Sequence, residues 1–326
     1  MSTLVTNSSD PTIIDPLMGS LLPERLHYHT GVLLDRDDFR AEQSYHRGRL
    51  ARLARYLHGY GTVAGLEVIY EPALAPAGSN PGHEARFSIA PGLAVDRLGR
   101  LIELWDHACV RLDPWLAWYN GTSERRARLS NATWAATSAH PAGVIADLFL
   151  RFRPCPHGRT PAFDTGAYDA LDATVPARIR DAWTLELIPR DEHDAGNPNQ
   201  EPPLPEPRMP DPATFSDQAA RLVALQQWKL QQAWAEGERQ DSSSEGMLLE
   251  AEHVRGHHQG DELFLARVVI QVTSVIRPDP DSLAAPGATA TVLERVSAAT
   301  PVVDNLSRRF TYATSELGWL GSGIRP

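Results

Sequence analysis

Apolar side chains between Asp35 and Gly59 recur at steps of three and four, which is the spacing of one face of an α-helix. Asp35 and Asp38 have the spacing of a capping box, and Gly59 stands where a left-handed glycine commonly ends a helix. We therefore predict a helix whose apolar stripe faces a core and whose arginines lie on the other face. The stripe comprises Phe39, Glu42, Tyr45 or His46, Leu50, Leu53 and Leu57.

Strand-like patterns follow this helix. They are rich in the aliphatic, β-branched and aromatic residues that strands favour, and they span residues 66–70, 86–90, 93–96, 101–104, 144–152, 183–188, 247–251, 262–272 and 290–296. A turn with Gly99 in the left-handed bulge position predicts an antiparallel hairpin. Gly59, Gly61 and Gly65 do not indicate a phosphate loop, because such loops lie between a strand and a following helix and the order here is reversed.

Proline interrupts the chain over residues 189–213, a density that favours extended backbone and excludes a packed core. A second amphipathic helix is predicted over residues 217–237, after the proline segment. Its apolar positions are Phe215, Ala219, Leu222, Val223, Gln226, Leu230 and Trp234. Because this helix lies between strands, the predicted fold class is α+β, with a mainly antiparallel β core, an N-terminal amphipathic helix and a second inserted helix.

The predicted organisation has five parts. They are an N-terminal arm (1–25), a helix plus β domain (26–188), a Pro-rich linker or insertion (189–216), a helix and strands that complete the core (217–300), and a C-terminal arm (301–326). Pro11, Pro16 and Pro23 prevent a long helix in the N-terminal arm, which we expect to pack on its own fold or on a neighbouring subunit.

Charge and length exclude several classes of partner. The 326 residues carry a net charge of −10, which argues against a nucleic-acid partner. No run reaches the roughly 18–20 apolar residues that cross a bilayer, and the N-terminus lacks the pattern of a secretory signal. We expect cytoplasmic synthesis and no membrane insertion. Cys109 and Cys155 are too few for a disulfide framework and are expected to be buried reduced thiols.

A histidine cluster is the best candidate for chemistry. His253, His257 and His258 lie among carboxylates, and imidazoles at this density can bind zinc or a similar cation. Gly256 and the flanking strand patterns favour a polar hairpin loop instead. The common nucleophile, metalloprotease, nucleotide and dinucleotide motifs do not occur. We therefore predict no enzyme, no catalytic residue and no cofactor, with a metal-binding protein or hydrolase kept as an alternative.

The opening segment resembles a bacterial family with the pattern R-Y-F-x-G-x-x-L-x-x-x-D-F-x-x-E-Q-x-Y-H, then L-H-G-x-G-V-x-x-G-L-x-V and P-G-x-A-I-D-x-x-G-R-x-I. The residues that carry the resemblance are 27–34, 38–39, 42–43, 45–46, 57–63, 65–68 and 91–102. It departs from the pattern at His27 and His29, where Arg and Phe are usual. The match is dense over residues 26–104 and thin elsewhere.

Proteins of this family are components of contractile phage-tail-like particles and extracellular injection systems. The resemblance implies a structural assembly subunit, baseplate-peripheral or fibre-attaching, that forms a homo-oligomer and binds baseplate, sheath, tube or fibre proteins. A receptor- or glycan-binding module built on the aromatic residues of 115–134 is the other alternative. Arginine and tryptophan are frequent anchors of protein interfaces. The predicted partner interface comprises Arg47, Arg49, Arg52, Arg55, Trp228, Trp234 and Trp319.

Overall fold

The computed structural model describes residues 25–78, 81–138, 140–161, 174–191, 202, 204, 208–228, 262–279, 281 and 288–311. Its helices are α1 (Arg36–His58), α2 (Leu112–Asn120) and α3 (Ser123–Asn131), with a 3-10 turn at Pro212–Thr214 and a helical stretch over 218–228. Its strands are β1 (Gly61–Gly65), β2 (Val68–Glu71), β3 (Arg86–Ile89), β4 (Gly92–Val95), β5 (Leu101–Leu104), β6 (Ala108–Arg111), β7 (Thr133–Trp134), β8 (Gly143–Pro161), β9 (Thr174–Pro189), β10 (Glu262–Ile270), β11 (Val272–Pro278), β12 (Thr289–Arg295) and β13 (Val302–Asp304). This confirms the predicted α+β class.

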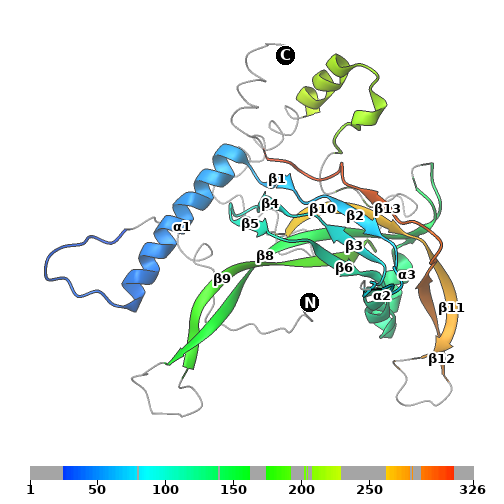
Figure 1. The fold of residues 1–326 in the computed structure, drawn as a ribbon, viewed down its shortest axis with the longest axis horizontal. Coiled ribbons are helices and arrows are strands. Elements are labelled where there is room, and N and C mark those ends of the chain that lie inside the picture. Colours follow the sequence, from blue (N-terminus) through cyan, green and yellow to red (C-terminus); the bar gives the residue numbers. More distant parts are fainter. Residues whose placement is uncertain are drawn as a thin grey trace.

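The strands form a body of several antiparallel sheets (Figure 1). The largest has the order β13-β10-β8-β7, with β9 also paired to β8. Two three-stranded sheets, β1-β4-β5 and β2-β3-β6, share one apolar core with it. The predicted hairpin is confirmed as β4 and β5, whose register places Val95 opposite Leu101. Gly99 has the positive φ of 85° that the turn was expected to need.

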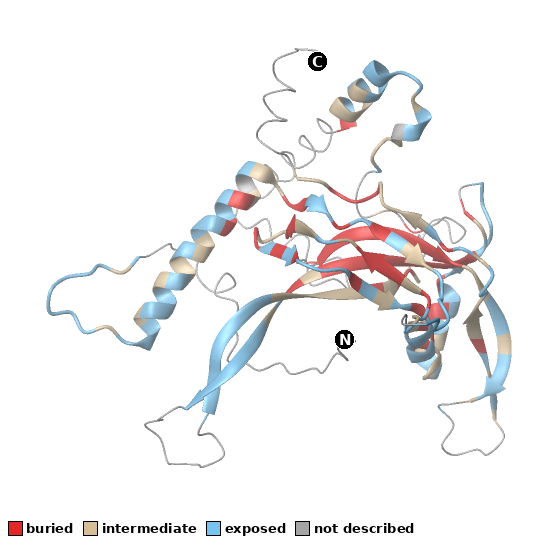
Figure 2. Ribbon diagram, in the orientation of Figure 1, coloured by how far each residue is buried: buried red, intermediate tan, exposed pale blue. Residues whose placement is uncertain are grey.

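The shared core lies on one face of β8 and β10 and is coloured red in Figure 2. Leu148 and Leu150 of β8 and Leu265 of β10 pack in it with Phe87 and Ile89 of β3. All nine residues of β10 are buried, so its other face is covered as well. This accounts for the continuous apolar run of that segment, because a strand buried on both sides does not alternate.

Buried charges occupy the second face of the same sheet. Asp147 on β8 is fully buried and accepts two hydrogen bonds from Arg267 on β10, at 2.7 and 2.9 Å. The Nε atom of Arg190 lies 3.3 Å from the same carboxylate. Arg267 also donates to the carbonyl of Pro202, at 2.5 Å, and Pro202 is buried. The prediction that the proline segment cannot pack is therefore wrong at this residue, because its backbone carbonyl satisfies a buried guanidinium.

The prediction of a C-terminal arm at 301–326 is wrong over residues 301–311. Residues 301–311 belong to the body: β13 pairs with β10, and Ser307, Arg308 and Arg309 are buried. Arg308 donates to the carbonyl of Leu66 at 2.5 Å and holds the turn between β1 and β2. Burial lowers the pKa of Arg308 to about 10, so it keeps its charge at neutral pH. The rest of the predicted arm lies outside the described residues.

The turn at Gly99 packs against α1, and a substitution of Gly99 should weaken that contact. A Cβ atom on Gly99 would lie 1.9 Å from the carbonyl oxygen of Ala51, and its φ is left-handed. We expect Gly99→Ala to cost about 2–4 kcal/mol in the free energy of unfolding, because strain and overpacking add. Gly31→Ala is the matched control, since Gly31 has a φ of 90° and open space around it. Urea unfolding of both variants with equal losses would contradict this view of the contact.

Candidate interaction surface

Local signals build α1 as predicted. Asp35 caps the helix by accepting from the backbone N–H groups of Asp37 and Asp38, and the Asp38 side chain completes the capping box. The helix ends at Gly59, whose φ is 73° and whose N–H donates to the carbonyl oxygen of Arg55. Its ψ of −171° differs from the left-handed helical cap that was expected. The upper half of α1 reaches the body while the lower half projects from it (Figure 1).

The face of α1 that meets the body is its small-residue face. Ala51 and Ala54 are buried, and Ala51 lies against the turn at Gly99. Only small side chains fit there, because the glycine backbone approaches the helix backbone directly. The prediction that the apolar stripe faces the core is therefore wrong.

The apolar stripe of α1 is instead exposed to solvent. Phe39 is 54% exposed, Leu50 57%, Leu53 52% and Leu57 62%. Gln43 and His46, which lie between them on the helix, are exposed too. We call these six residues the seam. Large apolar side chains that are grouped on one face, and not scattered singly, are typical of a binding surface.

The predicted arginines of α1 divide into two groups. Arg49 and Arg52 are exposed, which agrees with a role toward a partner. Arg47 lies 3.9 Å from Asp181 of β9, and the Nη1 atom of Arg55 is buried with no hydrogen-bond partner among the described residues. Arg47 therefore makes a contact within the chain, and part of the Arg55 guanidinium is buried.

Strands β8 and β9 continue past the body as a two-stranded ribbon, which we call the arm (153–161 and 174–182). The strand predicted at 144–152 was expected to end before Pro154, yet β8 runs to Pro161. Proline is tolerated here because each strand of the arm has one neighbour, so part of its N–H groups need no partner. The arm is coloured as exposed in Figure 2.

The arm has one basic face and one apolar face. Cross-strand partners share a face, and the face alternates along the strand. Cys155 pairs with Arg180 and His157 with Arg178, so the face on which they lie also holds Arg153 and Arg159. The opposite face holds Pro154, Pro156, Val175, Ile179 and Asp181. Ile179 is 56% exposed, so apolar surface is open on the arm as well as on α1.

The cysteines depart from their prediction. Cys109 and Cys155 are both exposed and both free, so neither is a core thiol. Cys155 belongs to the basic face of the arm. Both faces of a two-stranded ribbon are open to solvent, so the strand pattern alone did not show that this residue is exposed.

The tryptophans are less available than expected. Trp228 is buried, with 5% of its surface exposed, so it is not an open contact residue in this structure. In the aromatic segment, Trp134 is buried and half-buried Trp115 donates to the carbonyl of Leu187 at 2.7 Å. Trp118 is exposed under the guanidinium of Arg125, 4.2 Å from the ring centre. Trp234 and Trp319 lie outside the described residues.

The histidine cluster also lies outside the described residues, so His253, His257 and His258 stay a prediction. In the part of the chain that the structure describes, no group of three or more His, Cys, Asp or Glu side chains is arranged to hold a metal ion. None of the helices described there has the length and apolar character to cross a membrane.

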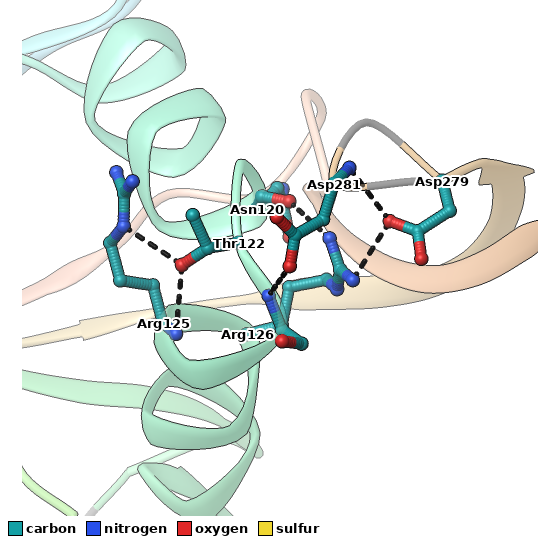
Figure 3. Close-up of polar contacts among 7 residues, drawn as sticks. Asn120, Thr122, Arg125, Arg126, Asp279 and Asp281 are labelled. Atoms are coloured by element: carbon teal, nitrogen blue, oxygen red, sulfur yellow. Dashed lines mark hydrogen bonds and ion pairs between the residues drawn. The ribbon is translucent and has the colours of Figure 1, made fainter. Parts of the chain in front are cut away.

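A polar clamp joins α2 and α3 to the β11–β12 hairpin (Figure 3). Arg126 of α3 pairs with Asp279 at 2.9 Å, and the N–H of Ser123 donates to Asp281 at 3.0 Å. That hydrogen bond lowers the pKa of Asp281. Asn120 adds a donor and an acceptor to the backbone of Leu293.

The clamp predicts a local effect on the hairpin. Arg126→Ala removes the ion pair to Asp279, and we expect amide hydrogen exchange in β11 and β12 to speed up about tenfold. Arg125→Ala is the control, because Arg125 donates its hydrogen bonds to Thr122 and to the carbonyl of Trp118, whereas Arg126 forms the ion pair to the hairpin. Equal exchange in both variants would show that the clamp does not hold the hairpin.

No protein-family model matches the chain, and no curated protein matches it. The family resemblance carried by residues 26–104 therefore stays a prediction. The exposed seam of α1 and the arm are described from the structure of this chain alone.

Proposed function

We propose that the chain is a structural assembly subunit of a contractile tail-like injection particle, positioned at the baseplate periphery or at a fibre attachment. In this role the chain binds neighbouring subunits. It has a β body and two elements that project from it, α1 and the arm. The body supplies the fixed geometry, since its sheets share one core and a buried ion pair joins β8 to β10 within the largest sheet. The projecting elements supply the contact surfaces.

One observation carries the proposal: the seam of α1 is exposed although α1 is already docked through Ala51 and Ala54. The leucines of the seam contribute little to the fold of the isolated chain. Exposed leucine on a helix lowers solubility unless a partner covers it, because apolar surface gains about 25 cal/mol per Å² when it leaves water. An assembly subunit has such a partner.

The arm supports the same proposal. It extends beyond the body, carries arginine on one face and apolar residues on the other, and meets α1 through the contact between Arg47 and Asp181. Interfaces between subunits combine both kinds of surface. No catalytic arrangement has to be assumed for any of these residues.

The test is sedimentation of the tagged chain from cells that carry its gene. We expect the chain to migrate in a density gradient with sheath and tube proteins, identified by mass spectrometry, in fractions where electron microscopy shows tail-like particles. A chain that stays at the position of a free protein, while complete particles sediment without it, would overturn the proposal.

A further inference from the structure

The seam of α1 has the spacing of a coiled coil. Its residues 39, 43, 46, 50, 53 and 57 are separated by steps of four, three, four, three and four. This places them at alternating d and a positions of the heptad, where side chains of one helix insert between those of another. Leu50 and Leu57 take a positions, and Phe39 and Leu53 take d positions. The pattern selects a helix as the occupant more than a strand or a loop.

The length of the seam sets the length of the occupant. From Phe39 to Leu57 the helix rises about 27 Å, so a partner helix of about five turns covers it. The face that docks on the body lies beside the seam and is formed by Ala51 and Ala54. A second helix can therefore pack on the seam without displacing α1.

Charge selects the chemistry of that helix. From Gln43 to His58, α1 carries Arg47, Arg49, Arg52 and Arg55 and no acidic residue. A second copy of α1 packed in parallel would bring the same positive half against itself, and like charges across an interface cost binding energy. A helix with acidic residues beside its apolar positions is attracted instead.

We propose that the seam binds an amphipathic helix of another protein, with apolar residues at a and d positions and glutamate or aspartate at the flanking e and g positions. The identity of that protein as a neighbouring subunit rests on the proposed function, whereas the binding itself does not. Arg49, at a g position, is the exposed arginine that the acidic flank meets, and Arg52 adds positive charge at the c position next to Leu53.

The experiment uses the full chain and two synthetic helices of 21 residues, by a design choice of about three heptads. Both carry leucine at a and d; one has glutamate at e and g, the other lysine. Fluorescence anisotropy should show the acidic helix binding at least about tenfold more tightly than the basic one at low salt, with a smaller difference at high salt. Circular dichroism should show the acidic helix gaining helicity on binding.

Variants of the chain sharpen the test. Arg49→Glu with Arg52→Glu should make the chain bind the lysine helix more tightly than the glutamate helix. Non-specific apolar binding would not change with these charges. Leu50→Ser with Leu53→Ser should weaken the binding of both synthetic helices about 100-fold or more, because leucines that become buried on binding anchor the interface. Ile276→Ser and Arg221→Glu, at exposed positions outside α1, are the matched controls and should change neither affinity.

Other outcomes overturn the inference. Equal binding of both synthetic helices, or binding of neither, would contradict the proposal of an acidic partner helix. A dimer of the free chain in light scattering that Leu50→Ser with Leu53→Ser dissociates assigns the seam to a second copy. Acidic-helix binding that appears only when residues 1–24 are deleted assigns it to the chain's own N-terminus. If the synthetic helices do not bind as expected but the chain sediments with particles, the proposed function stands and the acidic partner is wrong. If the acidic helix binds as expected but the chain does not sediment with particles, the partner stands and the proposed function is wrong.

Discussion

Leu50→Glu combined with Leu53→Glu should leave the chain folded and remove it from the particle fraction. Both leucines are more than half exposed, so neither charge enters the core and the free energy of unfolding should change by less than about 0.5 kcal/mol. In an interface, each glutamate would be buried without a partner at a cost of several kcal/mol. We expect at least a tenfold loss of the chain from sedimented particles, an effect of about 1.4 kcal/mol or more.

The control for this pair is Ile276→Glu on β11, which is the same change at another exposed apolar position. It should leave sedimentation unchanged. Urea unfolding checks that all variants are folded, and mass spectrometry of gradient fractions measures retention. Full retention of the double variant would mean that the seam is solvated surface only.

Asp147→Ala should be among the most destabilising single changes in the body. It leaves the guanidinium groups of Arg267 and Arg190 buried without their carboxylate, and removing one partner of a buried ion pair typically costs about 3–5 kcal/mol. Urea unfolding measures the loss. Asp147→Asn keeps the shape and removes the charge, so it separates the lost charge from the lost volume.

Glu294→Ala is the control for Asp147. Its partner Arg277 lies 2.8 Å away, but both side chains are largely exposed, and such pairs are worth less than about 1 kcal/mol. Similar losses in Asp147→Ala and Glu294→Ala would contradict the role of the buried charges as the cross-link between β8 and β10.

The elements that sequence could predict are those with local causes. The capping residues of α1, the Gly99 turn and the alternation of β5 all follow from neighbours within a few positions. The ion pair between Asp147 and Arg267 could not be predicted, because its members are 120 positions apart and nothing local marks them. The clamp between Arg126 and Asp279 could not be predicted for the same reason.

The orientation of α1 was predicted wrongly because an apolar stripe shows that a helix has a binding face without showing what binds there. Including Gln43 and His46 in place of Glu42 and Tyr45 gives the strict heptad spacing, and that was the available signal for a seam. The face that meets the body is the one with the small residues Ala51 and Ala54, where the backbone of Gly99 lies directly against the backbone of Ala51. That fact belongs to packing between distant parts of the chain.

The arm was not predicted, because the strand pattern of residues 144–152 ends shortly before Pro154 and Pro156. Proline ends a central strand but can continue in a ribbon, and the pairing partner of this segment, residues 174–182, carries no distinctive pattern. Alternation of Arg153, His157 and Arg159 with proline and threonine was the signal that could have revealed a two-faced ribbon.

Site-specific photo-crosslinking at position 53 tests the central claim most directly. A benzophenone amino acid replaces Leu53 in the tagged chain, particles are irradiated after assembly, and the products are identified by mass spectrometry; the same label at position 276 is the control. The account predicts a crosslink from position 53 to another particle subunit and none from position 276. Irradiated particles that contain the labelled chain but yield no crosslink from position 53, or only crosslinks within the chain, would contradict it.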